Sequence, residues 1–400
     1  MVFRSLSLPL GLALVAGMLL APSSHAAARS GAAAKPPAPT ATPLPLDDGW
    51  IYSFGGVGTA RAVYRTAPGG STLDPVPGAP ADYGADLTPP GDGSIGVPSH
   101  LRHDGSRWYA AYRWDSADPV FPNAGDHTVA AELDAVREGA SAGVPLTANR
   151  AACIYVLGTL PTWTASAAGA PDAGVAWVGA QWADQDGDPS HTCETLVSGG
   201  IFRADLVYDA AGAIVGAGAA TLAVPVPMTS GNVPDVVSFS WSPDGGQVAY
   251  TRSSDGDLYL AAAGSPVSGH VRLATGTYRN VDWSPDQDAV TAGLQTTIAF
   301  SGGGSGSNAK SGIWAIKPNG TGLVLLAEAV QGRTVRYAHQ TPFWSPAGTH
   351  LAYEEHQLQI GATYTHTIRR MAKDGSGNVV LVGESASQPL QALLEWTDAD

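Results

Sequence analysis

Short apolar segments separated by tight turns recur through the second half of the chain. The segment VSFSWSPDGGQVAYTRSSDGDLYLAAAG, which starts at Val237, alternates apolar and polar residues on both sides of the turn SPDG. A period of two is typical of β-strands that bury one face. In the turn, Pro243 fixes φ, Asp244 caps through its side chain and Gly245 accepts the backbone angles that follow. The pattern predicts two antiparallel strands joined by this turn.

The same pattern returns at RNVDWSPDQDAVTAGL from Arg279 and at QTPFWSPAGTHLAYEEH from Gln340. Each copy places a tryptophan at the end of an apolar stretch, before a tight turn and another strand. A second hairpin follows each copy, with Gly- and Asn- or Asp-rich turns such as KPNGTG and KDGSG. One repeat is therefore predicted to be four short strands.

Repeats of this kind, about 40 to 60 residues long with four strands each, are typical of a β-propeller. A single four-stranded sheet cannot bury both faces until it stacks on a neighbour. Weaker copies lie in the first half, around SHLRHDGSRWYAAYRW and LPTWTASAAGAPDAGVAWVGAQW. The residues that form the repeat are Trp241, Pro243, Asp244, Gly245, Trp283, Pro285, Asp286, Trp344, Pro346 and Trp396.

The two ends of the predicted propeller complement each other. GWIYSFGGVGTARAVYRT, from Gly49, reads as the later strands of a repeat that lacks its tryptophan strand, and LLEWTDAD, at 393–400, reads as that missing strand. We therefore expect an all-β protein with six four-stranded antiparallel blades over 47–400. Pairing of the C-terminal strand with the N-terminal blade would close the ring and leave no open edge there.

The residues FSWSPDGGQVAYTRSSDGDLYLAAAG resemble the TolB-like six-bladed propeller repeat, also called PD40 or WD40-like, of bacterial exported proteins. The resemblance covers roughly 237–400 and is thin over 48–222. It implies the propeller fold and structural roles for the repeat residues. The chain departs from TolB because only an Ala/Pro-rich leader, and no α/β domain, precedes its first predicted strand.

The first 26 residues read as a signal peptide, with Arg4, an apolar run and the small-residue stretch PSSHAAA. Residues 27–46 are rich in Ala, Pro and Thr, which predicts a disordered leader. No later stretch approaches the roughly 20 apolar residues of a membrane span. We expect an exported monomer, periplasmic or secreted, with no membrane span in the mature chain.

Net charge bears on the possible partners, and cysteine content bears on a possible disulfide. The chain has 21 Lys and Arg against 35 Asp and Glu, a net charge of −14, which disfavours nucleic acid as a partner. Its two cysteines, Cys153 and Cys193, form a disulfide in an oxidising compartment or are two separate buried thiols.

The stretch DQDGD offers one candidate cation site. Asp184, Asp186 and Asp188 alternate around Gly187, as hard oxygen ligands for Ca²⁺ would. Glu194 falls at the eleventh position of the loop, where a bidentate ligand is expected at the twelfth. The alternative is an acidic, solvated loop, and we expect no cofactor other than this Ca²⁺.

YEEHQLQIGATYTHT is the strongest candidate for acid–base chemistry, because it gathers Glu354, Glu355, His356 and His366 near one hairpin. Strand alternation points Glu355 away from its two neighbours. We therefore expect that no three of the four residues converge, which favours a solvated hairpin.

Other polar and aromatic residues give weaker hypotheses. His100 and His103 could share a metal only with a third ligand that the sequence does not identify. Trp114, Trp177 and Trp182 fall outside the repeat, so they either line a carbohydrate or peptide groove or pack in the core.

The sequence favours a non-enzymatic protein-binding or scaffolding module of the cell envelope or extracellular space. The partner surface is expected in three stretches, Asp115–Leu146, Asp184–Ser198 and Ser301–Ser311, since loops on a rigid scaffold carry recognition. The alternative is a hydrolase or lyase that acts on a carbohydrate or peptide at the propeller channel.

Overall fold

A computed structural model gives the architecture of the folded part of the chain. It describes residues 49–57, 60–70, 72–75, 99–101, 108–115, 130–137, 143–148, 152–156, 161–165, 173–183, 193, 195–230, 232–285, 296–305, 310–332, 335–359, 364–383 and 390–397. The expected signal peptide and leader lie outside these residues.

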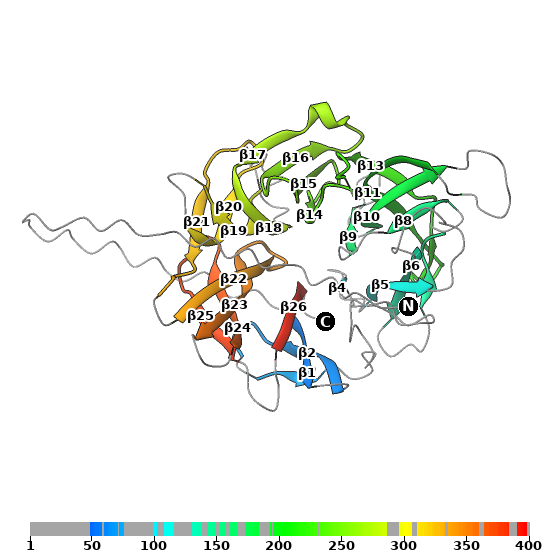
Figure 1. Cartoon of the computed structure of the whole chain (residues 1–400). Coiled ribbons are helices and arrows are strands. Elements are labelled where there is room, and N and C mark those ends of the chain that lie inside the picture. The colour runs from blue at the N-terminus through cyan, green and yellow to red at the C-terminus, as the bar shows by residue number, and fades with distance from the viewer. Residues whose placement is uncertain are drawn as a thin grey trace, which may run out of the picture. The chain divides into compact units, whose positions relative to one another are not determined.

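Five antiparallel sheets have four strands each (Figure 1). The terminal sheet pairs β26 (Leu390–Thr397), β1 (Trp50–Val57), β2 (Ala60–Thr66) and β3 (Asp74–Pro75) in that order. The second contains β4 (Ser99–Leu101), β5 (Trp108–Asp115), β6 (Ala130–Arg137) and β7 (Val144–Pro145).

The three sheets of the second half follow the repeat predicted from the sequence. They are β14 (Ser238–Trp241), β15 (Gln247–Thr251), β16 (Leu258–Ala262) and β17 (Val271–Ala274); β18 (Gly276–Trp283), β19 (Ile298–Gly304), β20 (Ser311–Ile316) and β21 (Val324–Glu328); and β22 (Val335–Trp344), β23 (His350–Gln359), β24 (Tyr364–Ala372) and β25 (Val379–Gly383). One short 3-10 helix, Val267–Gly269, precedes β17.

The expectation of six four-stranded blades is wrong, because five sheets have four strands and the remaining sheet has six. It contains β8 (Ile154–Val156), β9 (Thr162–Thr164), β10 (Gly174–Ala183), β11 (Thr195–Tyr208), β12 (Ile214–Ala217) and β13 (Thr221–Pro225). Strands β10 and β11 have 10 and 14 residues. Each is long enough to pair with two short strands on one edge, β8 and β9 on β10, and β12 and β13 on β11.

The tight turns of the repeat form as their residues dictate. The N–H of Gly245 donates to the carbonyl of Ser242 at 2.8 Å, and Asp244 accepts from the hydroxyl of Ser242 at 2.6 Å. Gly245 and Gly348, at equivalent places in two blades, both have φ of 67°, which favours glycine.

Side chains of one innermost strand bind the backbone of the next. The N–H of Trp283 donates to Ser240 Oγ at 3.0 Å, and the N–H of Trp344 donates to Asp282 Oδ2 at 2.7 Å. In both cases the acceptor is the residue before the tryptophan of the preceding blade. These bonds fix the sheets β14–β17, β18–β21 and β22–β25 in a common orientation.

The C-terminal strand joins the N-terminal sheet. β26 pairs with β1 in antiparallel register, with Trp396 opposite Ile51. Figure 1 shows β26 (red) beside β1 and β2 (blue), and β26 also contacts β22, β23, β24 and β4.

A disulfide links Cys153, before β8, to Cys193, before β11. It links the start of the short edge strand β8 to the β10–β11 connection of the six-stranded sheet. Among the described residues, no helix has the length and apolarity to cross a membrane.

Candidate functional site

The candidate site lies where three strands extend beyond the common blade length. β22 and β23 have ten residues and β24 has nine, whereas β14, β15 and β16 have four or five. The extension carries two clusters of ionisable side chains, one on each face of the sheet, because strand residues alternate. We call the face that packs on β18–β21 the first face, and the face that packs on the terminal sheet the second face.

A β-bulge in β22 sets the composition of both clusters. Trp344 pairs with Leu351, but after the bulge Gln340 pairs with Glu354, one residue out of step. The extra residue is Thr341, with φ of 49°, and its hydroxyl accepts from Asn280 Nδ2 at 3.2 Å. Without this shift His339 would face His356; with it, His339 lies opposite Glu355 on the first face.

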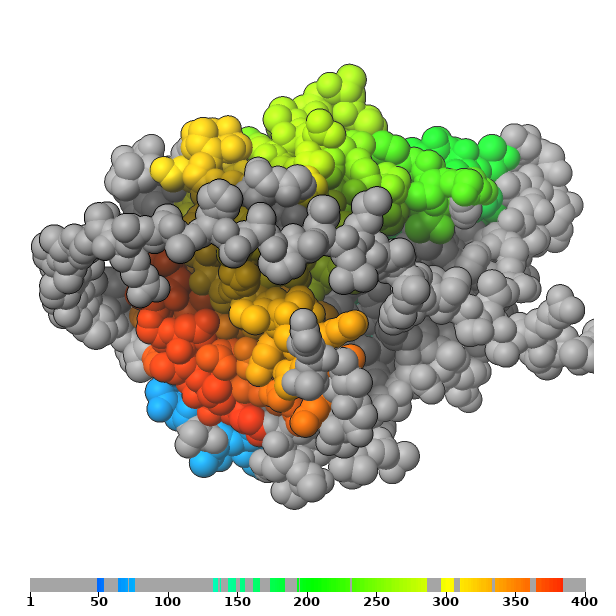
Figure 2. All heavy atoms as spheres, turned by 60° about the vertical axis from the view of Figure 1, so that its left-hand side comes forward, coloured from blue at the N-terminus to red at the C-terminus, as the bar shows by residue number. Residues whose placement is uncertain are grey.

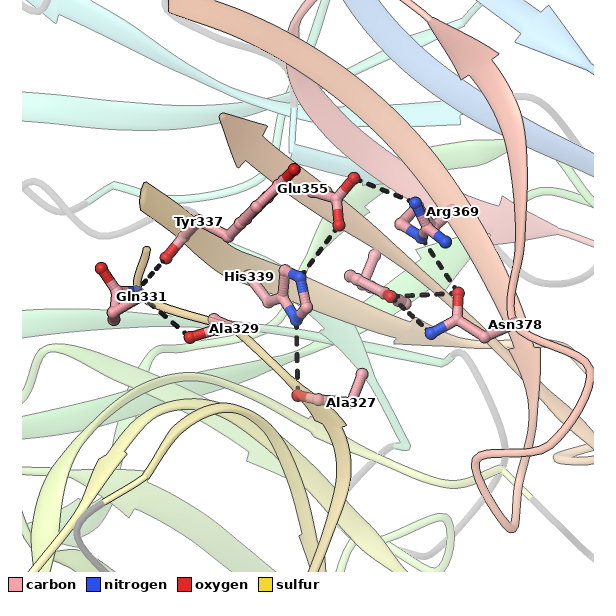
Figure 3. A network of polar contacts seen from close by, with 9 residues as sticks. Ala327, Ala329, Gln331, Tyr337, His339, Glu355, Arg369 and Asn378 are labelled. Atoms are coloured by element: carbon pink, nitrogen blue, oxygen red, sulfur yellow. Dashed lines mark hydrogen bonds and ion pairs between the residues drawn. The ribbon is translucent and has the colours of Figure 1, made fainter. Parts of the chain in front are cut away.

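The first-face cluster extends from β22 across β23 and β24 to Asn378, which directly precedes β25 (Figure 3). His339 Nε2 lies 3.1 Å from Glu355 Oε2, and Arg369 Nη1 donates to Glu355 Oε1 at 3.0 Å. Arg369 Nε donates to Asn378 Oδ1 at 3.0 Å, and Asn378 Nδ2 donates to Tyr353 Oη at 2.8 Å. These contacts link β22, β23 and β24 to the β24–β25 connection.

The electrostatics of the first face favour an ionised carboxylate. Burial alone raises the pKa of Glu355, but the hydrogen bond from His339 and the charge of Arg369 outweigh it and leave this pKa below the ordinary value. His339 Nδ1 lies 3.3 Å from the carbonyl oxygen of Ala327, which is only an acceptor. Both imidazole nitrogens of His339 therefore lie within reach of protein acceptors.

The second-face cluster joins Glu354, His356 and His366. His356 Nε2 lies 2.6 Å from Glu354 Oε2, and both side chains are 9% exposed. His366 lies directly opposite His356 in the register of β23 and β24, with ring centroids 4.1 Å apart. The expectation that no three of the four residues converge is therefore wrong, because alternation along one strand says nothing of the partner strand.

The two clusters are built mainly for internal contacts. A general base needs an imidazole nitrogen that substrate can reach, yet both nitrogens of His339 contact protein acceptors. His356 is buried, with 8% of its surface exposed. Within the described parts of the chain, no group of three or more His, Cys, Asp or Glu side chains is arranged to hold a metal ion.

Several predicted residues lie outside this cluster or outside the described residues. Asp184, Asp186, Asp188, Glu194, His103 and Asp286 are outside the described residues, and His100, Trp114 and Trp396 are described only as members of β4, β5 and β26. Trp177 and Trp182 are 0% and 8% exposed. The hypothesis that these two tryptophans line a groove is therefore wrong; they pack in the core.

Sequence reasoning missed His339, Arg369 and Asn378. His339 of β22 and Arg369 of β24 contact Glu355 itself, and Asn378, in the β24–β25 connection, contacts Arg369. A signal existed in the long alternation of RYAHQ and THTIRRMA, which predicts paired strands without fixing their register.

Comparison with known proteins adds solved structures of low similarity. No protein family model matches the chain, and no curated protein matches it. TolB from Acinetobacter baumannii is 15% identical over 89% of this chain and 68% of its own, with a TM-score of 0.48. The periplasmic gluconolactonase PpgL of Pseudomonas aeruginosa is 11% identical over 86% and 98% of the two chains, with a TM-score of 0.44.

A third similar structure is an oligogalacturonate lyase in complex with manganese. It is 13% identical over 85% of this chain and 76% of its own, with a TM-score of 0.42. Because the identities and TM-scores of these structures are low, we infer function from the residues of this chain alone.

Proposed function

We propose that this chain is an exported, non-enzymatic protein-binding or scaffolding module of the cell envelope or extracellular space. The proposal includes the signal peptide at 1–26, the leader at 27–46 and a TolB-like propeller over 47–400. In this proposal the six-stranded sheet serves as the sixth blade, and the pairing of β26 with β1 closes the ring.

The observation that carries the proposal is the place of three strand connections in the pairing order of their sheets. The stretches expected to bind a partner contain the β5–β6, β10–β11 and β19–β20 connections. Each connection joins the second strand of its sheet to the third in the pairing order. A propeller places all such connections at one end, so the three stretches form one recognition surface on a rigid scaffold.

The chemistry of the candidate site supports binding over catalysis. Its carboxylates and imidazoles contact one another, and the Glu354–His356 pair is buried. The alternative is a hydrolase or lyase that acts on a carbohydrate or peptide at the channel. The two carboxylate–imidazole pairs favour it, because such pairs serve general acid–base catalysis elsewhere.

Site-specific cross-linking tests the proposal with a matched pair of positions. Lys310 and Lys317 are both exposed and flank β20, so the strand separates them by about 20 Å. A photo-reactive amino acid at 310 lies beside the β19–β20 connection, and one at 317 lies at the opposite end. We expect one partner protein of the envelope to cross-link reproducibly from 310 and far less from 317.

Equal capture from both positions, or none from 310, contradicts the proposal. Turnover of an oligosaccharide or peptide library tests the alternative, a hydrolase or lyase. Activity that is lost in His356→Gln and kept in Lys317→Ala would favour the enzyme.

A further inference from the structure

We propose that Asn319 is a self-modifying site, at which the backbone nitrogen of Gly320 displaces the side-chain amide, assisted by donors from Thr321, and leaves aspartate or isoaspartate. The co-reactant is water, and the reaction needs no enzyme or cofactor. The site lies in the turn between β20 and β21, at the end of the sheet opposite the β19–β20 connection. The inference is therefore independent of the partner-binding proposal.

The residue that follows Asn319 distinguishes it from the other asparagines of the chain. Asn319 is the one asparagine that a glycine follows; the others precede alanine, arginine or valine. A side chain on the following residue crowds the attacking nitrogen, and a β-branched side chain is also stiff. Gly320 has no side chain, and its φ of 79° suits glycine. Its backbone nitrogen is therefore the least hindered of those that could attack.

Contacts within the turn prepare the Asn319 amide for attack. The backbone N–H and the hydroxyl of Thr321 donate to Asn319 Oδ1 at 3.0 and 2.7 Å. Because Gly320 lies between these two residues, both bonds fold the asparagine side chain back across it. They also place two donors at the oxygen on which negative charge develops during attack at Cγ.

The reaction balances with water alone. The Gly320 nitrogen gives its proton to solvent base and bonds to Asn319 Cγ, and the Cγ–Nδ2 bond breaks as ammonia leaves with a proton from water. The product is a succinimide ring that includes the Gly320 nitrogen. Water then adds to either carbonyl carbon of the ring. Cleavage of the bond from nitrogen to Cγ leaves aspartate, whereas cleavage at the backbone carbonyl leaves isoaspartate.

The turn is exposed and has few contacts that keep it closed. The N–H of Gly320 donates to the carbonyl of Lys317 at 2.9 Å, and this bond must break before the nitrogen loses its proton. Asn319, Gly320 and Thr321 are all exposed, and Figure 2 shows the part of the chain with β20 and β21 (yellow) at the surface. A Cβ on Gly320 would have Leu273 Cδ2 as its nearest neighbour, at 3.8 Å. Such a turn opens locally at little cost.

The turn between β24 and β25 has the same hydrogen bonds but differs in its reactivity. Asp374 Oδ1 accepts from the N–H and the hydroxyl of Ser376 at 2.9 and 2.6 Å, and Gly375 lies between them. The bonds from Ser376 lower the pKa of Asp374, so its carboxylate is ionised and resists attack by a nucleophile. A Cβ on Gly375 would lie 2.7 Å from the carbonyl oxygen of Leu326, so this turn also packs against β21.

The same comparison indicates how each product affects the fold. Aspartate at 319 would accept from Thr321 as Asp374 accepts from Ser376, so the β20–β21 turn is kept and gains one negative charge. Isoaspartate lengthens the backbone inside the turn. The bond from the N–H of Lys317 to the carbonyl of Thr321, 3.0 Å long, then no longer closes in the same geometry.

Peptide mapping of the folded full chain tests the site. The purified protein is kept at about pH 8.5, where base removes the amide proton, and is digested at intervals. Conversion replaces NH2 by OH in the mass of the peptide. We expect it at Asn319 at least about tenfold faster than at Asn378, a barrier difference of about 1.4 kcal/mol. Asn378 is the internal control, because it lies in the corresponding connection of the next sheet, precedes valine and donates to Tyr353.

Two variants test the steps of the reaction, and their melting temperatures check that the fold is kept. Gly320→Ala crowds the attacking nitrogen and should slow conversion about tenfold or more, again about 1.4 kcal/mol in the barrier. Thr321→Val keeps the branched shape without the hydroxyl and should slow it about threefold to tenfold, the effect of one ordinary hydrogen bond. Lys317→Ala leaves the backbone contacts of the turn in place and should keep the wild-type rate.

Equal rates at Asn319 and Asn378 in the folded protein would overturn the proposal. Conversion of Asn319 only in chain unfolded by urea would also overturn it, because the native turn would then protect the amide. An undiminished rate in Gly320→Ala would exclude attack by this nitrogen, and an undiminished rate in Thr321→Val would exclude assistance by its hydroxyl.

Discussion

The two faces of the β22–β25 sheet are held to their neighbours in different ways. On the first face, Trp344 and Tyr353 are buried against β18–β21, and Asp282 binds the backbone of Trp344. On the second face, Ile51 of the terminal sheet packs in a buried apolar cluster with Phe343, Ala352 and Ile368. The first contact combines large aromatic area with directional hydrogen bonds, whereas the second depends on apolar packing.

One position explains much of the difference. The residue before the repeat tryptophan is Ser240 in one blade and Asp282 in the next, and each accepts the N–H of the following tryptophan. In the β22–β25 sheet this position is Phe343, whose side chain has no acceptor. A side-chain-to-backbone hydrogen bond therefore joins β14–β17 to β18–β21 and β18–β21 to β22–β25. Phe343 cannot provide such a bond at the contact with the terminal sheet.

The largest expected effect comes from removal of the C-terminal strand. Deletion of 393–400 removes most of β26 and exposes the edge of β1 that pairs with it. It also disrupts the contact between the terminal sheet and the second face of the β22–β25 sheet. We expect a loss of more than about 4 kcal/mol in the free energy of unfolding, beyond most single substitutions. Thermal unfolding measures it.

The control for that deletion removes only 398–400 and leaves β26 intact. Its melting temperature should match that of the full chain. If the longer deletion also leaves the melting temperature unchanged, β26 does not hold the terminal sheet and the proposed ring closure fails.

The blades and turns could be predicted from the sequence because their signals are local. Pro243 and Gly245 determine a turn within four residues, and the tryptophans recur at one place in each repeat. The six-stranded sheet could not, since β10 and β11 differ from regular strands in length and partner number rather than in alternation.

The candidate site was predictable only in part. Glu354, Glu355 and His356 stand out as neighbours in the sequence, but their partners are fixed by register. The bulge at Thr341 decides that His339 meets Glu355, and the β23–β24 pairing decides that His366 meets His356. Both are properties of two strands together, which one strand's pattern does not contain.

Substitution of Asp282 tests the hydrogen bond that joins the first face to β18–β21. Asp282→Ala leaves the N–H of Trp344 without its acceptor, which should lower the free energy of unfolding by about 1–3 kcal/mol. Asp282→Asn keeps an acceptor oxygen and should cost less. Chemical denaturation measures both variants.

The corresponding residue on the second face is Phe343. Its substitution removes no hydrogen bond of this kind, because the side chain has no acceptor. Phe343→Leu keeps an apolar side chain and should cost about 1.5 kcal/mol or less. If Asp282→Ala and Asp282→Asn are equally stable, the hydrogen bond does not distinguish the two faces.

The smallest effect at neutral pH is expected from Glu355→Gln, which keeps the shape and one acceptor of the first-face cluster. It should cost less than about 1.5 kcal/mol at pH 7. The variant is informative mainly through the pH dependence of the free energy of unfolding. Because the pKa of Glu355 is lowered in the folded state, the carboxylate stabilises the fold above its ordinary value of 4.5, and this contribution is lost as pH falls through the folded-state pKa.

Wild-type stability should therefore decline below pH 4.5 more steeply than that of Glu355→Gln, as denaturation across the acid range would show. An acid transition that Glu355→Gln removes would establish that this carboxylate holds the first face at low pH. A transition that the variant leaves unaltered would mean that the titrating group lies outside the first-face cluster.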